Sequence, residues 1–130
     1  MPRLLPFLIA LLVLPGCLQD ETLSGYGEGL WALTQQDGTP MTAEVTLDLR
    51  APGRVSGTAP CNRYSAAQTA PYPWVEVGPI TATRRACPDL PAEQAYFDLL
   101  SRMTLAEVSG PVLILSNDAG ETLTFRRVQP

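Results

Sequence analysis

The side chains that could do chemistry in this chain are arginines, carboxylates and cysteines, because its 130 residues include no histidine. The Ser-His-Asp and Cys-His arrangements, the commonest zinc-hydrolase sites and most proton shuttles are therefore excluded. The basic residues are all arginine, which excludes a Ser-Lys dyad. Paired carboxylates could still serve a glycosidase, but the acids lie mostly on predicted solvent faces and share no motif. These acids are Glu44, Asp48, Glu76, Glu93, Asp98 and Glu107. We expect no catalysis, no cofactor and no metal site.

Cys17 stands at the end of a three-part export signal. One basic residue, Arg3, precedes an apolar run that ends at Leu14, and the run is shorter than the roughly 20 residues that a membrane-spanning helix needs. The sequence Leu14-Pro15-Gly16-Cys17 resembles the bacterial lipobox, apart from proline at its second position. We expect residues 1–16 to be a lipoprotein signal peptide and Cys17 to carry the lipid anchor. An ordinary secreted protein with a free Cys17 is the alternative.

Leu18 would follow the lipid-bearing cysteine in the mature chain. Aspartate at that position retains enterobacterial lipoproteins at the inner membrane, so Leu18 suggests an outer-membrane anchor that faces the periplasm. Residues 17–27 are mostly polar and glycine-bearing and predict a flexible tether before one domain over residues 28–128. Loss of Arg3 leaves eight arginines against 13 acids, a net charge of −5, which argues against nucleic acid as a partner.

Cys61 and Cys87 are the two remaining cysteines, with 26 residues of separation. Export to an oxidising compartment favours a disulfide between them. Two buried free thiols are the alternative, because a sequence does not specify the bond geometry. The two cysteines are too far apart for a C-x-x-C redox pair.

Polar residues beside the two cysteines form a candidate recognition patch. These residues are Asn62, Arg63, Tyr64, Arg84 and Arg85. A disulfide would bring the two segments together, so that the arginines could bind a carboxylate or phosphate group and Tyr64 could supply contact area. The structural alternative is that Asn62 bonds to turn backbone and that the arginines pair with nearby acids.

Most of the elements that must position these residues are short strands. Apolar residues alternate with polar ones from Val45 to Leu49, the pattern of a half-buried strand. Strands are also predicted at 29–35, which ends at the Asp37-Gly38 turn signal, and at 54–59 after Pro52-Gly53. We expect these first strands to form an antiparallel meander.

Two further regions predict strands. Residues 72–77 alternate, with Val75 and Val77 on one face and Trp74 on the other, where Trp74 is a second candidate contact point. Residues 112–116 and 122–128 flank a turn and predict a closing hairpin. Its predicted core residues are Leu113, Leu115, Leu123 and Phe125.

Residues 89–103 carry apolar residues at the three-and-four spacing of an amphipathic helix. The predicted stripe comprises Ala92, Ala95, Tyr96, Leu99, Leu100 and Met103. Asp89 is a candidate N-cap, and Asp98 is predicted to pair with Arg102. The expected fold class is α+β, a strongly curved, mostly antiparallel sheet in the manner of a partly open barrel, with this helix packed on it.

The order of these segments resembles the META domain of the HslJ-like heat-shock lipoproteins. The similar segments are Trp31–Leu33, Arg54–Gly57 leading to Cys61–Tyr64, Ile80–Cys87 and the helix around Tyr96 and Leu100. The resemblance covers about residues 28 to 127. Pro60, and Ala66-Ala67 where the family commonly has glycine, depart from its pattern.

The resemblance implies a role in the bacterial envelope, with links to heat shock, stress or antibiotic tolerance, and no established enzymatic reaction. We expect a monomeric domain that is attached to the membrane by its lipid and binds a protein or glycan of the envelope. The alternative is an inhibitor of an exported hydrolase such as a lysozyme or protease, because an acidic surface favours encounter with a basic lysozyme.

Overall fold

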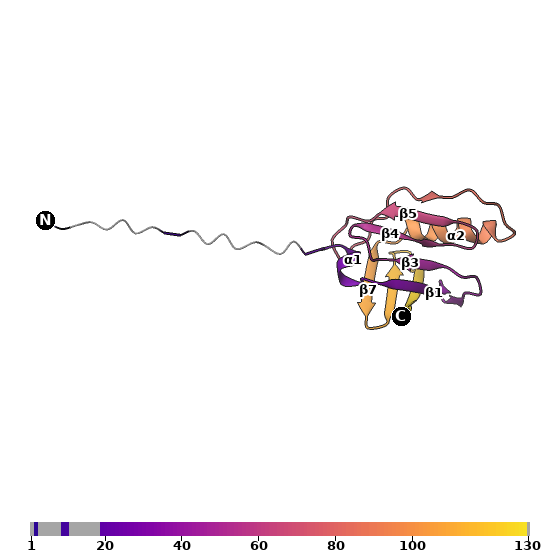
Figure 1. Cartoon of the computed structure of the whole chain (residues 1–130). Helices are drawn as coiled ribbons and strands as arrows, with labels where there is room; N and C mark the ends of the chain where they lie inside the picture. The colour runs from indigo at the N-terminus through magenta and orange to yellow at the C-terminus, as the bar shows by residue number, and fades with distance from the viewer. Residues whose placement is uncertain (1, 3–8, 11–18, 130) are drawn as a thin grey trace.

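The computed structural model describes residues 2, 9–10 and 19–129, so Cys17 and most of the predicted signal peptide lie outside the described residues. The described chain folds into one open sheet with a short and a long helix, α1 (Leu23–Tyr26) and α2 (Leu90–Ser101) (Figure 1). None of the helices in this described part is long and apolar enough to cross a membrane.

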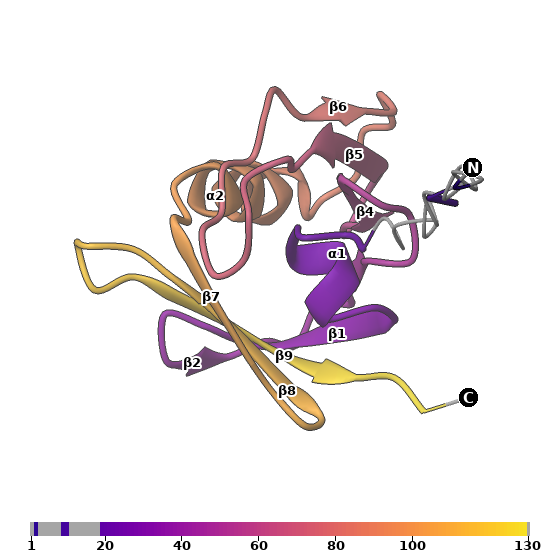
Figure 2. The same ribbon diagram turned by 90° about the vertical axis from the view of Figure 1, so that its left-hand side faces the viewer.

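The sheet contains nine strands within residues 19–129, and all their pairings are antiparallel. The strands are β1 (Leu30–Gln36), β2 (Thr39–Pro40), β3 (Thr46–Asp48), β4 (Arg54–Thr58), β5 (Arg63–Ala67), β6 (Thr81–Ala82), β7 (Leu105–Ser109), β8 (Val112–Ser116) and β9 (Thr122–Arg127). Their order is β6-β5-β4-β3-β1-β9-β8-β7, and β2 pairs with β1. The end strands β6 and β7 do not pair, so the sheet does not close into a barrel. Figure 2 shows α2 over the open side, between β5–β6 and β7. The predicted α+β class is confirmed.

Local sequence signals account for the best-predicted parts of the sheet. Asp37 and Gly38 have φ angles of 51° and 80°, and positive φ at both positions is what a tight two-residue hairpin turn requires. The side chains predicted to point inward from Val45 to Leu49 are at most 2% exposed, as are all four predicted core residues of the β8–β9 hairpin. The meander prediction is also confirmed, because β1, β3 and β4 pair in series.

The strand predicted over residues 72–77 is wrong. This segment makes only isolated bridges, in which Trp74 pairs with Leu105 and Val77 with Gln68. Proline at 71, 73 and 79 removes backbone donors, which prevents a continuous ladder. The predicted faces are nevertheless right, since Val75 is buried and Trp74 is exposed. Strands β5 and β7 were not predicted.

The end of the predicted tether is part of the folded domain. Leu23 of α1 is fully buried, and the Gly27 carbonyl accepts a 2.8 Å hydrogen bond from the indole of buried Trp31. The tether prediction for residues 17–27 is therefore wrong from about Asp20 onward. Polar and glycine residues indicated flexibility there, but buried Leu23 and the hydrogen bonds of the Asp20 carboxylate to Thr22 and Ser24 hold the segment in place.

The predicted helix at 89–103 forms as α2, but its buried face is rotated from the predicted one. Ala92 and Ala95 are exposed, whereas Glu93 and Phe97 are buried. Asp89 takes the N-cap position without a side-chain capping bond. Burial of Tyr96 and Phe97 removes more apolar area from water than burial of Ala92 and Ala95 would. This difference favours the observed orientation of the helix.

Arg102 does not pair with Asp98 as predicted. Its guanidinium instead donates to the Glu121 carboxylate at 2.9 and 3.1 Å, joining the end of α2 to the β8–β9 turn. Asn117 Nδ2 donates to the same carboxylate at 3.0 Å. The Arg102 bond first, and then the Asn117 bond, lower the pKa of Glu121 from 4.5 to about 2.

The Glu121 carboxyl is therefore expected to titrate with a midpoint near pH 2 in the folded protein. Because the folded pKa is depressed, the stabilising contribution is complete above the unfolded pKa of 4.5 and is lost as the pH falls toward 2. NMR titration of the Glu121 carboxyl carbon measures this midpoint. Arg102→Ala should move it upward toward 4.5, whereas Arg84→Ala, which changes an arginine that does not contribute to this shift, should leave it unchanged.

Candidate functional site

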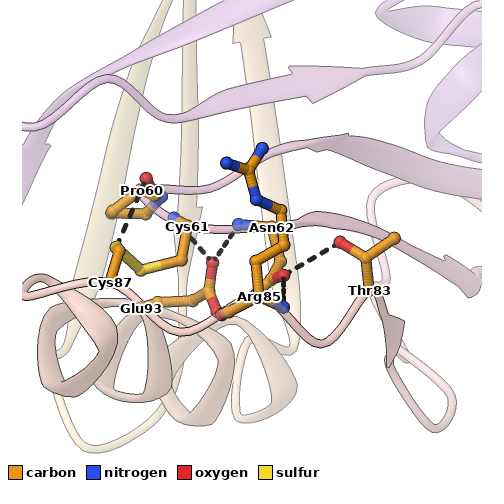
Figure 3. Close-up of a disulfide and its surroundings, with 7 residues drawn as sticks. All are labelled: Pro60, Cys61, Asn62, Thr83, Arg85, Cys87 and Glu93. Atoms are coloured by element: carbon orange, nitrogen blue, oxygen red, sulfur yellow. Dashed lines mark hydrogen bonds between the residues drawn. A yellow bond between two sulfur atoms is a disulfide. The ribbon is translucent and has the colours of Figure 1, made fainter.

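The disulfide between Cys61 and Cys87 is present, and it joins the loop before β5 to the segment that precedes α2 (Figure 3). The two Cα atoms are 5.7 Å apart, within the usual range for this bond. It fixes the segment 83–89 against the loop that contains Asn62. The pairing favoured by the sequence is therefore correct in this structure.

Glu93 is the central polar residue beneath this disulfide. It projects from the first turn of α2 and is only 1% exposed. Its Oε1 accepts hydrogen bonds from the backbone N–H groups of Cys61, at 3.0 Å, and Asn62, at 2.8 Å. Its Oε2 accepts a 2.7 Å bond from the Asn62 side chain. The prediction of Glu93 as a solvent-facing acid is wrong, because these three donors replace its water shell.

Asn62 connects Glu93 to the segment after β6. Its Oδ1 accepts bonds from the Thr83 hydroxyl at 2.9 Å and the Arg85 N–H at 2.6 Å, and its Nδ2 donates to the Arg85 carbonyl at 3.0 Å. Both backbone polar groups of Arg85 are thus held by one buried amide (Figure 3). The structural interpretation of Asn62 as a residue that bonds turn backbone is confirmed.

Tyr64 does not offer the contact area that the sequence suggested. The residue is 3% exposed, and its hydroxyl bonds to the Thr46 carbonyl and the Tyr96 hydroxyl, both at 2.7 Å. Burial is the main cause of a raised pKa for Tyr64 and for Tyr96. Tyr64 therefore acts in the core, where it joins β5 to β3 and α2.

A groove of about 520 Å³ lies between α2 and the chain that runs from β6 to the disulfide. Its lining includes Asn62 and Glu93, together with Leu90 and Phe97 as apolar residues. The polar side chains that also line it are Thr83, Arg84, Arg85, Gln94, Asp98 and Ser101. The network under the disulfide thus supports one wall of a mixed polar and apolar groove.

Arg84 and Arg85 are the groove's basic residues, and both are exposed. Neither forms an ion pair with any acid among residues 19–129, so the predicted pairing with nearby acids is absent there. Arg63 is exposed on β5 and does not line this groove. Of the five predicted patch residues, the structure therefore brings two to the groove surface and places Asn62 beneath them.

Sequence reasoning missed Glu93, although a signal for it was present. Glu93 stands at the i, i+3, i+4 and i+7 spacing with Tyr96, Phe97 and Leu100, so it belongs to the buried stripe of a helix. Buried Gln68 was also missed; its side chain accepts from the Glu76 N–H and donates to the Ala70 carbonyl. No group of three or more candidate metal ligands occurs in the part of the chain that the structure describes.

Comparisons with known proteins agree with this architecture. An NMR structure of a protein from Burkholderia xenovorans is similar, with a TM-score of 0.62 and 29% identity, over 87% of this chain and 86% of that chain. A second NMR structure, at 20% identity, is similar in fold, with a TM-score of 0.61 over 77% of this chain and 89% of the other. No curated protein matches. A family model for the META domain matches residues 22–130. The chain therefore belongs to the META domain family.

Proposed function

We propose that this META-domain protein is a noncatalytic, lipid-anchored lipoprotein of the periplasm that supports envelope integrity or stress tolerance by binding another envelope component. The observation that supports binding is the groove beside α2, where Arg84 and Arg85 are exposed without acidic partners among residues 19–129. The resemblance to HslJ-like heat-shock lipoproteins supports the envelope and stress role.

The groove chemistry fits a ligand that presents a carboxylate near an uncharged or apolar portion. The planar guanidinium of arginine binds carboxylates through two parallel hydrogen bonds. Phe97 and Leu90 offer apolar contact, while Asp98 on α2 disfavours a ligand that is anionic along its whole length. Carboxylate-bearing fragments of the cell-wall glycopeptide combine these features, and they are accessible in the periplasm.

Replacement of both groove arginines, Arg84→Ala and Arg85→Ala, is expected to weaken binding of such fragments at least about tenfold, since a charged hydrogen bond contributes about 1.5–3 kcal/mol. NMR titration of the protein with purified muropeptides measures the affinity and maps the bound surface. Arg54→Ala is the matched control, because Arg54 is exposed on β4 outside this groove. Shifts that avoid the groove, or equal affinities for all three proteins, would count against the proposed site.

The proposed anchor has an independent test. Intact mass of the protein purified from native membranes, with and without reductant, should show acylation at Cys17 and one disulfide between Cys61 and Cys87. Deletion of the gene should sensitise the envelope to heat, detergent or antibiotic. An unlipidated mass contradicts the anchor, and an unchanged deletion strain contradicts the stress role.

Inhibition of an exported protease is the second candidate function. Arg84 and Arg85 are exposed on a segment that the disulfide holds in place. Residues 83–86 are exposed, and the Asn62 bonds and the disulfide hold them in one conformation. Such a segment fits the arginine pocket of trypsin-like enzymes without a large entropic cost. Assays of trypsin and lysozyme with excess protein test the inhibitor function. If both enzymes keep full activity, this second candidate is ruled out.

A further inference from the structure

We propose that the face formed by α1 and the turn at residues 71–74 docks on the membrane that holds the lipid anchor. The contact would be made by Tyr26, Tyr72 and Trp74, which we call the aromatic surface. The occupant is the headgroup layer of a phospholipid membrane. This inference rests on the proposed lipidation of Cys17, and it adds an orientation that lipidation alone does not specify.

The chain immediately before α1 is hydrogen-bonded to the start of that helix. The Asp20 carboxylate accepts bonds from the Thr22 N–H, the Thr22 hydroxyl and the Ser24 hydroxyl, at 2.9, 2.6 and 2.6 Å. Hydrogen bonding by these groups lowers the pKa of Asp20, with Ser24 as the largest cause. A Cβ atom added at Gly25 would lie 1.8 Å from the Asp20 carbonyl oxygen, so the chain packs closely on itself here.

Contacts with the rest of the domain continue through α1. The Tyr72 N–H donates to the Glu21 carbonyl at 2.7 Å, and the Ser24 hydroxyl accepts a 3.0 Å bond from the Gly53 N–H. Leu23 is fully buried. The freely jointed part of a lipidated chain would therefore end at about Asp20.

Only Leu18 and Gln19 separate Cys17 from Asp20. Three residue steps of fully extended backbone span at most about 11 Å. A domain of this size has a radius of gyration of about 13 Å, so the link is shorter than the domain's own width. Anchoring at Cys17 would hold the α1 face against the headgroups and prevent the domain from turning away.

Exposed aromatic residues occur both on α1 and in the turn at residues 71–74. Tyr26 is 52% exposed, and its ring stacks on Tyr72 with centroids 4.4 Å apart and an interplanar angle of 13°. Trp74, two residues after Tyr72, is 57% exposed. Tyrosine and tryptophan favour the membrane interface because each has an apolar ring and a polar group.

The charges on this face favour uncharged or zwitterionic headgroups. Acids and arginines are mixed there: Asp20 and Glu28 line a hollow with Arg50, which pairs with Asp48, and Arg127 donates to the Glu28 carbonyl. These described residues do not form the basic cluster that recognises anionic lipids. Figure 1 shows α1 at one end of the domain and α2 extending to the other. Docking through α1 would therefore leave the groove beside α2 open to the periplasm.

The chain contains two tryptophans, and their exposures make fluorescence a direct test. Trp31 is fully buried and Trp74 is 57% exposed. The lipidated protein, confirmed by intact mass, is placed in phosphatidylcholine vesicles and compared with the unlipidated Cys17→Ala protein in solution. Docking should shift Trp74 emission to shorter wavelength, reduce acrylamide quenching at least about twofold, and allow quenching by lipids with brominated chains. Trp74→Phe supplies the constant Trp31 signal for subtraction.

A spacer variant tests the link, with a flexible twelve-residue Gly-Ser insertion between Gln19 and Asp20. The insertion should return acrylamide quenching of Trp74 toward the solution value while acylation and the fold persist. A lipidated protein whose Trp74 is quenched equally in vesicles and in solution would overturn the docking and leave the proposed anchor intact. An unlipidated mass would overturn both. Protection by muropeptides and not by vesicles would assign the aromatic surface to a glycan and also overturn the docking.

Discussion

Glu93→Ala is expected to lower the free energy of unfolding by about 3–5 kcal/mol, because three hydrogen-bond donors lose their acceptor. The substitution leaves the N–H groups of Cys61 and Asn62 and the Asn62 side-chain amide without their acceptor. Each buried donor without an acceptor costs about 1–3 kcal/mol of stability. Glu93 borders the groove, so water can enter the space left by its side chain and bond to some of these donors. The expected loss therefore lies in the lower part of the range obtained by adding the three costs. Urea unfolding of the purified protein measures the difference.

Two variants show whether the loss comes from the hydrogen bonds. Gln94→Ala changes an exposed neighbour on the same helix and should alter stability by less than about 0.5 kcal/mol. Glu93→Gln keeps the acceptor for the backbone but turns an NH2 group toward Asn62 Nδ2, itself a donor. It should therefore cost less than the alanine substitution and more than the control. Equal stability of the Glu93→Ala and Gln94→Ala proteins would show that the network is not stabilising.

Removal of the disulfide is expected to destabilise the domain by about 3–4 kcal/mol, because the unfolded chain regains the entropy of a loop with 26 residues of separation. The double variant Cys61→Ala, Cys87→Ala tests this without a reductant. Urea unfolding of the variant should show an earlier midpoint with a similar slope. Reduction of the wild-type protein should give the same midpoint, and reductant should leave the double variant unchanged. A midpoint that is insensitive to both treatments would contradict the prediction.

The stability losses from Glu93→Ala and from removal of the disulfide should not be additive. Glu93 accepts the N–H of Cys61 itself, so the carboxylate and the disulfide constrain the same loop. Residues that share a partner couple by about 0.5–3 kcal/mol in double-mutant cycles. Loss of the disulfide should therefore change the cost of Glu93→Ala measurably. Strict additivity would indicate that the two constraints act separately on α2 and on the segment after β6.

Several elements of the fold follow from the sequence because their causes are local. The Asp37-Gly38 dipeptide predicted a turn, which positive φ at both residues confirms. The alternation from Val45 to Leu49 likewise predicted a strand correctly. The β8–β9 hairpin and the existence of α2 are similar cases. The family pattern then led to the correct domain family, although the sequence signals for β5 and β7 were too weak to predict either strand.

Burial depends on residues that are distant in sequence, and here the predictions failed. Residues 20–27 resemble a tether until the fold supplies a buried site for Leu23, and the alternation at 72–77 lacked the continuous partners of a strand. The phase of α2 was set by packing of Tyr96 and Phe97 on the sheet. The local sequence does not show which side chains are buried. The free energy of burial depends on the apolar area that distant residues cover, and this area is set by the tertiary structure.

The sequence by itself identified three residues of the groove, Asn62, Arg84 and Arg85, as polar neighbours of two cysteines. Only the tertiary structure decided their roles: it buried Asn62 and Tyr64, exposed Arg84 and Arg85, and added Glu93 from a helix 31 residues away from Asn62. The helical spacing of Glu93 places it on the buried face of α2, but it does not show which donors the carboxylate will meet. It becomes a structural acceptor only when the fold surrounds it with N–H groups that have no other partner, and that condition exists only in three dimensions.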